Sequence, residues 1–221
     1  MPRFYSIIEN EHIRIGCTGE TVWVLDKNDT VLAKFKDLSY AYRAAISPRG
    51  DLLAVKGGQG RLAIYSLKEL SLIKKFRFSK VNYGQDDGFC FSSDGKYLLN
   101  IERHEDDLHS AISVYDTADF SLVSRALQGE NMMIEHVQEV DGNYYVLGFL
   151  RGDDLVIRSY CVAKYENGCI CDIFKITETE HSLYRKDLDR SVFGESYDGA
   201  KEPQPIHTLG ELWAHYRGAK S

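Results

Sequence analysis

The stretch Phe89–Leu99 (FCFSSDGKYLL) decides the fold, because a related stretch, Ala45–Ala54 (AISPRGDLLA), stands earlier in the chain. Superimposing Ser92 on Ser47 also superimposes a glycine and a leucine of the two stretches, at an offset of 45 residues. In each copy, apolar runs flank turn-forming residues, which indicates a strand, a tight glycine-containing turn and a second strand. The chain therefore contains a repeated β-hairpin.

Each copy is followed by a second pair of related apolar runs. The first copy continues into Ala63–Ser66 and Leu70–Ile73, and the second continues into Ser113–Asp116 and Phe120–Val123. These later segments stand 50 residues apart, five more than the first hairpins. Two hairpins per repeat, recurring about every 40 to 50 residues, indicate the four-stranded blade of a β-propeller.

The same pattern can be followed along most of the chain. The first repeat spans Ile13–Phe35, the second begins near Tyr42, and the third begins near Asp87. A fourth, degenerate repeat lies within Glu139–Phe174, where Asn167-Gly168 is a strong hairpin signal because both residue types tolerate positive φ. We therefore expect an all-β fold, a small β-propeller of about four to five blades.

The strand pattern stops after residue 176, and residues 177–207 are mostly polar. Thr208 and Glu211 have the spacing of a capping box, which predicts a short C-terminal helix. Apolar residues share one face of this helix: Leu209, Leu212, Trp213 and Tyr216. The sequence thus predicts propeller repeats over 1–176 and a polar tail over 177–221, whose helix packs on the propeller or closes it.

The composition is that of an ordinary water-soluble protein. The chain has 221 residues, 43% hydrophobic content, five cysteines and a net charge of −6. The negative charge argues against a nucleic-acid partner. The first residues lack the apolar core of a signal peptide, and no run is long enough to cross a bilayer. The odd number of cysteines favours a reducing compartment, so we expect a cytoplasmic protein without membrane association.

The Ser-x-Asp-Gly turn, followed by a strand of the Val-Tyr-Asp type, resembles the WD40 repeat. In that family a Trp-Asp dipeptide ends the third strand of a blade, and Asp26, Ser66 and Asp116 stand at this place here. The resemblance covers about residues 10–176, although the Gly-His dipeptide and the Trp of the family are absent. It implies a scaffold for protein binding, with no catalytic residues and no cofactor.

The number of repeats leaves the arrangement of the blades open. Closed WD40 rings normally have more blades than this chain can supply, and an open array would expose its edge strands. A small ring, a half-ring closed by self-association, or an array capped by residues 177–221 would each resolve the problem. We expect a closed or tail-capped monomer, with a dimer as the alternative.

The most distinctive polar segment lies in the middle loop of the third repeat. Loops on a rigid scaffold often carry recognition, and acidic side chains would attract a basic surface. We therefore predict a protein partner there, bound by six residues: Glu102, His104, Glu105, Asp106, Asp107 and His109. These residue types could also bind a divalent metal, but the spacing matches no known ligand pattern, so we predict no metal site.

Other candidate sites have simpler interpretations. Cys161, Cys169 and Cys171 lack a second metal-binding pair and are predicted to be small buried thiols. The loop 57–60 lacks the Lys-Ser/Thr of a phosphate-binding loop, and no Gly-x-Ser-x-Gly elbow occurs. The seven histidines are scattered, although separate blades could still bring some together.

Three functions follow from these observations. We expect a non-enzymatic module that binds a partner protein through its propeller loops. A sharper alternative is a bacterial immunity protein that neutralises a basic toxin, suggested by size, charge and the acidic segment. The third is a propeller hydrolase or lactonase with a site in the central channel.

Overall fold

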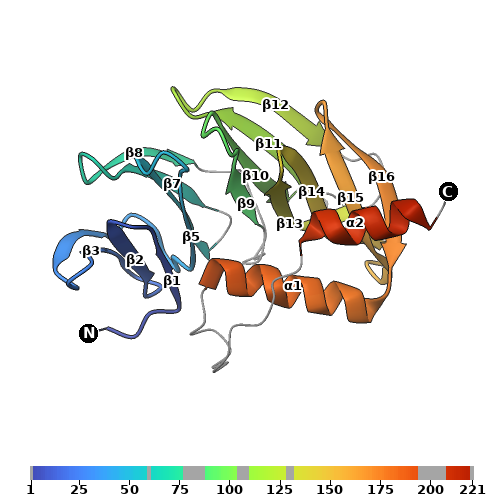
Figure 1. Ribbon diagram of the computed structural model, residues 1–221, viewed down its shortest axis with the longest axis horizontal. Coiled ribbons are helices and arrows are strands. Elements are labelled where there is room, and N and C mark those ends of the chain that lie inside the picture. Colours follow the sequence, from blue (N-terminus) through green and yellow to red (C-terminus); the bar gives the residue numbers. More distant parts are fainter. Residues whose placement is uncertain are drawn as a thin grey trace. The chain divides into compact units, whose positions relative to one another are not determined.

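The computed structural model describes residues 2–58, 61–76, 88–103, 110–127, 132–193 and 208–219, with side chains omitted at 103, 127 and 186–193. In this part the chain forms four antiparallel sheets of four strands each, and in every sheet the strands lie in sequence order (Figure 1). Such a meander of four strands is the blade of a β-propeller. The expectation of an all-β, propeller-type fold is confirmed.

The strands divide evenly among four blades. Blade 1 consists of β1 (Ser6–Glu9), β2 (Ile13–Cys17), β3 (Val22–Asp26) and β4 (Val31–Phe35). Blade 2 consists of β5 (Arg43–Ile46), β6 (Leu52–Lys56), β7 (Leu62–Ser66) and β8 (Ser71–Phe76). Blade 3 consists of β9 (Phe89–Phe91), β10 (Tyr97–Arg103), β11 (Ser110–Asp116) and β12 (Leu122–Leu127). Blade 4 consists of β13 (Met132–Val140), β14 (Asn143–Arg151), β15 (Ile157–Glu166) and β16 (Cys169–Ile176).

The chain divides into two compact units. Unit 1 contains blades 1 and 2, and unit 2 contains blades 3 and 4. Each unit has its own core between its two blades. In unit 1 this core includes Val24 and Tyr65, and in unit 2 it includes Ile112 and Val146.

The repeated turn has the same geometry in both copies. The Gly50 N–H donates to the Ser47 carbonyl at 2.8 Å, and the Gly95 N–H donates to the Ser92 carbonyl at 2.8 Å. Both serine hydroxyls also accept a hydrogen bond from the strand that follows, at 3.0 and 2.8 Å. The glycines have φ of +74° and +69°, a region that L-residues rarely adopt. The sequence pattern thus predicted the turn correctly.

The second hairpin also repeats. In every blade the pairing of the third and fourth strands shifts register once. The turn between these strands contains one non-glycine residue of positive φ in each blade, namely Asp29, Leu70, Phe120 and Asn167, and blade 4 adds Gly168. The degenerate fourth repeat is therefore a blade built like the others.

Helix α2 (Leu209–Gly218) covers the face of blade 4 that points away from blade 3. Alternation along β14 sends Val146 into the core with blade 3, whereas Tyr145 and Leu147 pack beneath α2. Leu212 and Trp213 of α2 are buried on this face. The predicted short C-terminal helix is confirmed.

The predicted capping box is present at the start of α2. Thr208 accepts a hydrogen bond from the Glu211 N–H, and the Glu211 carboxylate accepts one from the Thr208 N–H at 2.8 Å. Thr208→Ala removes the first of these bonds and should lower the free energy of unfolding by about 1 kcal/mol. Urea denaturation followed by circular dichroism measures the change. A Thr208→Ser variant, which keeps the hydroxyl, should remain close to the wild type, and an equal loss in both variants would contradict this role.

A second helix, α1 (Glu178–Phe193), lies where the sequence analysis expected only a polar tail. Thr177 caps it, because its hydroxyl accepts a hydrogen bond from the Glu180 N–H at 3.2 Å. The Tyr216 hydroxyl of α2 donates to the Glu180 carboxylate at 2.7 Å, which raises the pKa of Tyr216 to about 12. The two helices are thus joined by a polar contact. Within the described residues, neither helix is both long and apolar enough to span a membrane.

Candidate partner-binding site

The predicted partner-binding segment begins inside a strand of blade 3. Glu102 lies in β10 and is 8% exposed. Its carboxylate accepts hydrogen bonds from the Tyr115 hydroxyl and from Arg125, each at 2.6 Å. Burial and the contact with Glu102 raise the pKa of Tyr115. Glu102 therefore takes part in a polar network within its own blade.

His104, Glu105, Asp106, Asp107 and His109 lie outside the described residues. Partner binding by the segment 102–109 stays a prediction. The residue that follows the segment is firmly placed, because the buried Ser110 hydroxyl accepts a hydrogen bond from the Ile134 N–H of β13 at 3.1 Å. The segment thus connects β10 with β11, and each of these strands is held by hydrogen bonds next to the segment.

The hairpin between β14 and β15 belongs to the same end of unit 2. Ser110 contacts the beginning of β13, where Met132 pairs with Leu150 near the end of β14. The turn after β14 carries three consecutive aliphatic side chains that are exposed, and we call them the apolar tip. They are Leu155 (51% exposed), Val156 (51%) and Ile157 (41%).

The apolar tip is held rigidly. Gly152 and Val156 are joined by a backbone hydrogen bond of 2.9 Å, and the Leu155 N–H donates to the Gly152 carbonyl at 2.9 Å. Asp154 accepts from the Val156 N–H at 3.1 Å and from Arg158 at 2.6 Å. A rigid exposed turn loses little conformational entropy when it binds.

The backbone of Leu155 is strained, because its φ is +63°. Phe120 shares this conformation, but its side chain is only 6% exposed, so burial compensates for the strain. Leu155 has no such compensation. This hairpin turn thus displays an apolar side chain at some energetic cost.

A buried charged cluster lies elsewhere in unit 2. Glu135 occupies the β-bulge of β13, between the paired residues Ile134 and His136. Its carboxylate contacts His181 Nε2 at 2.5 Å and Arg185 Nη1 at 3.0 Å, and both partners project from α1. His181 also stacks on the Tyr160 ring, with centroids 4.2 Å apart. Glu135 and His181 are at most 5% exposed, so the cluster fixes α1 to blade 4 rather than facing a substrate.

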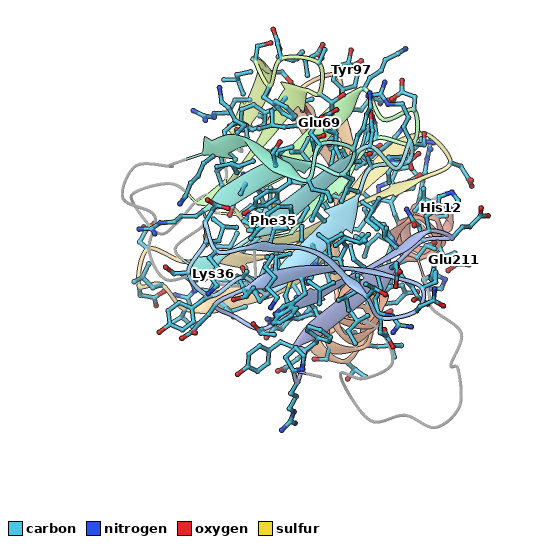
Figure 2. All side chains as sticks on the ribbon, turned by 90° about the vertical axis from the view of Figure 1, so that its left-hand side faces the viewer. His12, Phe35, Lys36, Glu69, Tyr97 and Glu211 are labelled. Atoms are coloured by element: carbon cyan, nitrogen blue, oxygen red, sulfur yellow. The ribbon has the colours of Figure 1, made fainter. Side chains whose placement is uncertain are left out.

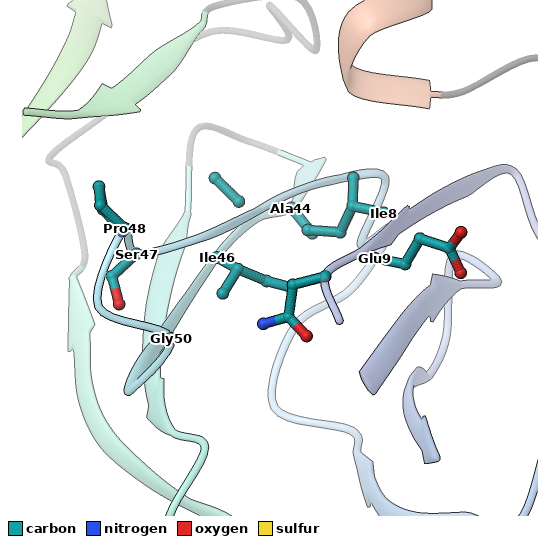
Figure 3. Close-up of a pocket in the computed structure, with 9 residues that line it drawn as sticks. Ile8, Glu9, Ala44, Ile46, Ser47, Pro48 and Gly50 are labelled. Carbon is teal, nitrogen blue, oxygen red and sulfur yellow. The ribbon is translucent and has the colours of Figure 1, made fainter. Parts of the chain in front are cut away.

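Unit 1 contains a pocket of about 410 Å³ between β1 and the β5–β6 hairpin (Figure 3). Its wall is mostly apolar, with Ile8, Ala44, Ile46 and Pro48, and Glu9 lies at its rim. Hydrogen bonds from Lys27 and Arg14 lower the pKa of the Glu9 carboxyl and balance its charge. The volume falls within the range of small-ligand pockets. This pocket could not be predicted from the sequence, because its residues come from two different repeats.

The cysteines are only partly as predicted. Cys161 is buried, but Cys171 is half-buried and Cys169 is exposed. Cys169 pairs with Glu166 at the beginning of the outer strand β16, next to the hairpin turn, where the core does not reach. Among the described residues, no three His, Cys, Asp or Glu side chains are grouped so that they could hold a metal ion.

No family model matches this chain. No curated protein matches it either. Among solved structures, it is similar to hydrazine synthase of Kuenenia stuttgartiensis, with a TM-score of 0.64 and 16% identity over 80% of this chain and 50% of that chain. It is also similar to the WD40 domain of Toxoplasma gondii coronin, with a TM-score of 0.55 and 19% identity over 77% of this chain and 44% of that chain.

The chain spans about half the length of each of these two structures. Identities this low show the fold alone. One of these two structures is an enzyme and the other is a WD40 domain, so the shared fold does not determine the function. The comparisons therefore support a WD40-like β-propeller fold for this chain.

Proposed function

We propose that this chain is a non-enzymatic protein-interaction module that binds a partner with a basic surface. The partner contacts the loop end of unit 2, which comprises the segment 104–109 and the turn Gly152–Ile157. The observation that carries the proposal is the apolar tip, where three exposed aliphatic side chains are held in a fixed turn. Clustered apolar groups on a surface favour burial against another molecule.

The charge of the loop end indicates the sign of the charge on the partner's surface. Glu105, Asp106 and Asp107 belong to the sequence segment between β10 and β11, and Asp153 is exposed beside the apolar tip. Acidic residues in the segments that adjoin an apolar tip would match an interface with a hydrophobic core and a charged rim. Such a rim accelerates the approach of a basic protein and selects against acidic ones. A basic toxin would be one partner of this kind.

The test begins with capture of the partner by tagged full-length protein and identification by mass spectrometry. Titration calorimetry with the purified partner then compares three variants. The double variant Asp106→Lys/Asp107→Lys and the single variant Leu155→Asn should each raise Kd about tenfold or more. Asparagine tolerates the left-handed backbone of this position, so the melting temperature should not fall.

The matched control is Leu122→Ala. Leu122 is 49% exposed at the beginning of β12, at the opposite end of unit 2, and its loss should leave Kd unchanged. An unchanged Kd in the two loop-end variants would refute the proposed site. Conversion of many molecules of a small substrate per molecule of purified chain would refute the non-enzymatic assignment.

A further inference from the structure

Unit 1 presents two exposed tyrosines that the proposed function does not use. Tyr5 is 65% exposed and Tyr40 is 69% exposed, which makes them the most exposed large hydrophobic side chains of the described residues. Tyr5 precedes β1, and Tyr40 lies between blade 1 and β5. Tyrosine is enriched at the energetic centres of protein interfaces, because its flat ring offers contact area at a low cost in entropy.

Both rings lie over small residues that belong to one continuous floor. A Cβ atom on Gly19 would lie 3.5 Å from the Tyr5 ring, and a Cβ atom on Gly58 would lie 3.3 Å from the Tyr40 ring. Gly19 and Ala41 form a bridge with two backbone hydrogen bonds, of 3.1 and 2.8 Å, which connects the two sides. We call this surface the tyrosine platform. Glycine at positions 19 and 58 leaves the backbone accessible, which lets another chain approach it closely.

The backbone holds Tyr40 in a strained conformation. Its φ is +54°, and the exposed ring gains little from burial in return. The Gly58 N–H donates to the carbonyls of Ser39 and Tyr40, at 3.0 and 3.2 Å. Position 57 must be glycine, because a Cβ atom there would lie 2.7 Å from the Ser39 carbonyl oxygen. The chain thus maintains a costly turn that displays a tyrosine.

The segments around the tyrosine platform carry a small excess of positive charge, although the chain as a whole carries a net charge of −6. Arg3, Lys36 and Arg61 lie on these segments, and Lys36, which is labelled in Figure 2, is exposed. Lys75 donates to the Asp37 carbonyl. Glu20 and Asp37 are the acidic residues of the same segments. This local excess of positive charge favours an acidic partner over a basic one.

We propose that the tyrosine platform binds an extended acidic peptide segment of another protein. The tyrosine rings would pack on apolar side chains of the peptide, such as proline, and the surrounding cations would pair with its carboxylates. This site lies in the other unit and selects the opposite charge from the loop end of unit 2, so either can fail without the other.

The probe is an acetylated octapeptide of alternating glutamate and proline, labelled with fluorescein, and its binding to the full chain is measured by fluorescence anisotropy. A lysine–proline octapeptide serves as the charge control and should bind about tenfold more weakly or not at all. Tyr40→Gly relieves the strained backbone and removes the ring. It should weaken binding of the glutamate peptide about tenfold, while the melting temperature stays equal or rises.

Two further variants separate the ring from other effects. Tyr40→Phe keeps the ring and should bind within about threefold of the wild type. Tyr97→Ala, which removes an exposed tyrosine of unit 2, should bind like the wild type. No binding of the glutamate peptide, equal binding of both peptides, or full binding by Tyr40→Gly would overturn the proposal.

Discussion

Gly148→Ala is expected to destabilise unit 2 by about 3 kcal/mol, because no neighbouring group can yield to the added methyl group. Gly148 lies in β14, opposite Ile134 of β13. A Cβ atom at this position would overlap with the Met133 carbonyl oxygen and would lie 3.1 Å from the Ile134 Cα. Both are backbone atoms in the buried first part of β13, so relief requires the β-bulge at Glu135 to shift. The cluster of Glu135 with α1 would shift with it.

Chemical denaturation followed by circular dichroism measures this loss, and hydrogen exchange locates it in blade 4. Gly218→Ala is the matched control, since no atom lies within 4 Å of the added methyl group and the residue ends a helix. It should leave the free energy of unfolding equal or slightly higher. If Gly148→Ala proved as stable as Gly218→Ala, the close pairing of β13 with β14 would be wrong.

Trp213→Ala is expected to lower the free energy of unfolding by about 3 to 5 kcal/mol. Trp213 is 5% exposed, and its ring packs on Tyr145 and Phe174, with centroids at 5.5 and 6.0 Å. Its Nε1–H donates to the Asp172 carbonyl of β16 at 3.2 Å. Truncation leaves a cavity under α2 and also removes the donor to that carbonyl. Helix α2 should then detach from blade 4 before the blades themselves unfold.

Limited proteolysis of the Trp213→Ala variant under native conditions tests whether α2 detaches from blade 4, because a detached helix becomes cleavable. Leu183→Ala on α1 is the control, since Leu183 is 45% exposed and should matter little for stability. Equal stability of Trp213→Ala and Leu183→Ala would show that α2 does not depend on this ring. Far-UV circular dichroism is the suitable probe, because the substitution removes a fluorophore.

The blades were predictable from the sequence because their signals are local. The turn that begins at Ser92 and the turn that begins at Ser47 are each specified by a few adjacent residues, and so is the capping box at Thr208. The fourth blade was recognised mainly through Asn167-Gly168, whose positive φ values the structure contains. Such features need no knowledge of distant contacts.

Helix α1 escaped prediction because its contacts depend on a distant strand. His181 appears on a polar segment, and only the bulge at Glu135 gives it a buried partner. The apolar tip escaped for a related reason. Leu155 and Val156 look like core residues in the sequence, whereas the hairpin extends beyond the neighbouring blade core and leaves them exposed. Burial is decided by packing between blades, which periodicity alone does not specify.

The order of the strands has a consequence for how the protein is made. Throughout the described part of the chain, each strand is paired only with strands next to it in the sequence. Short loops close at low entropic cost, and such local pairing favours rapid folding. Among the described residues, the core between blades 1 and 2 draws its members from Ile8 to Leu70. Blades 1 and 2 can therefore form their shared core on the ribosome before the strands of unit 2 have been synthesised.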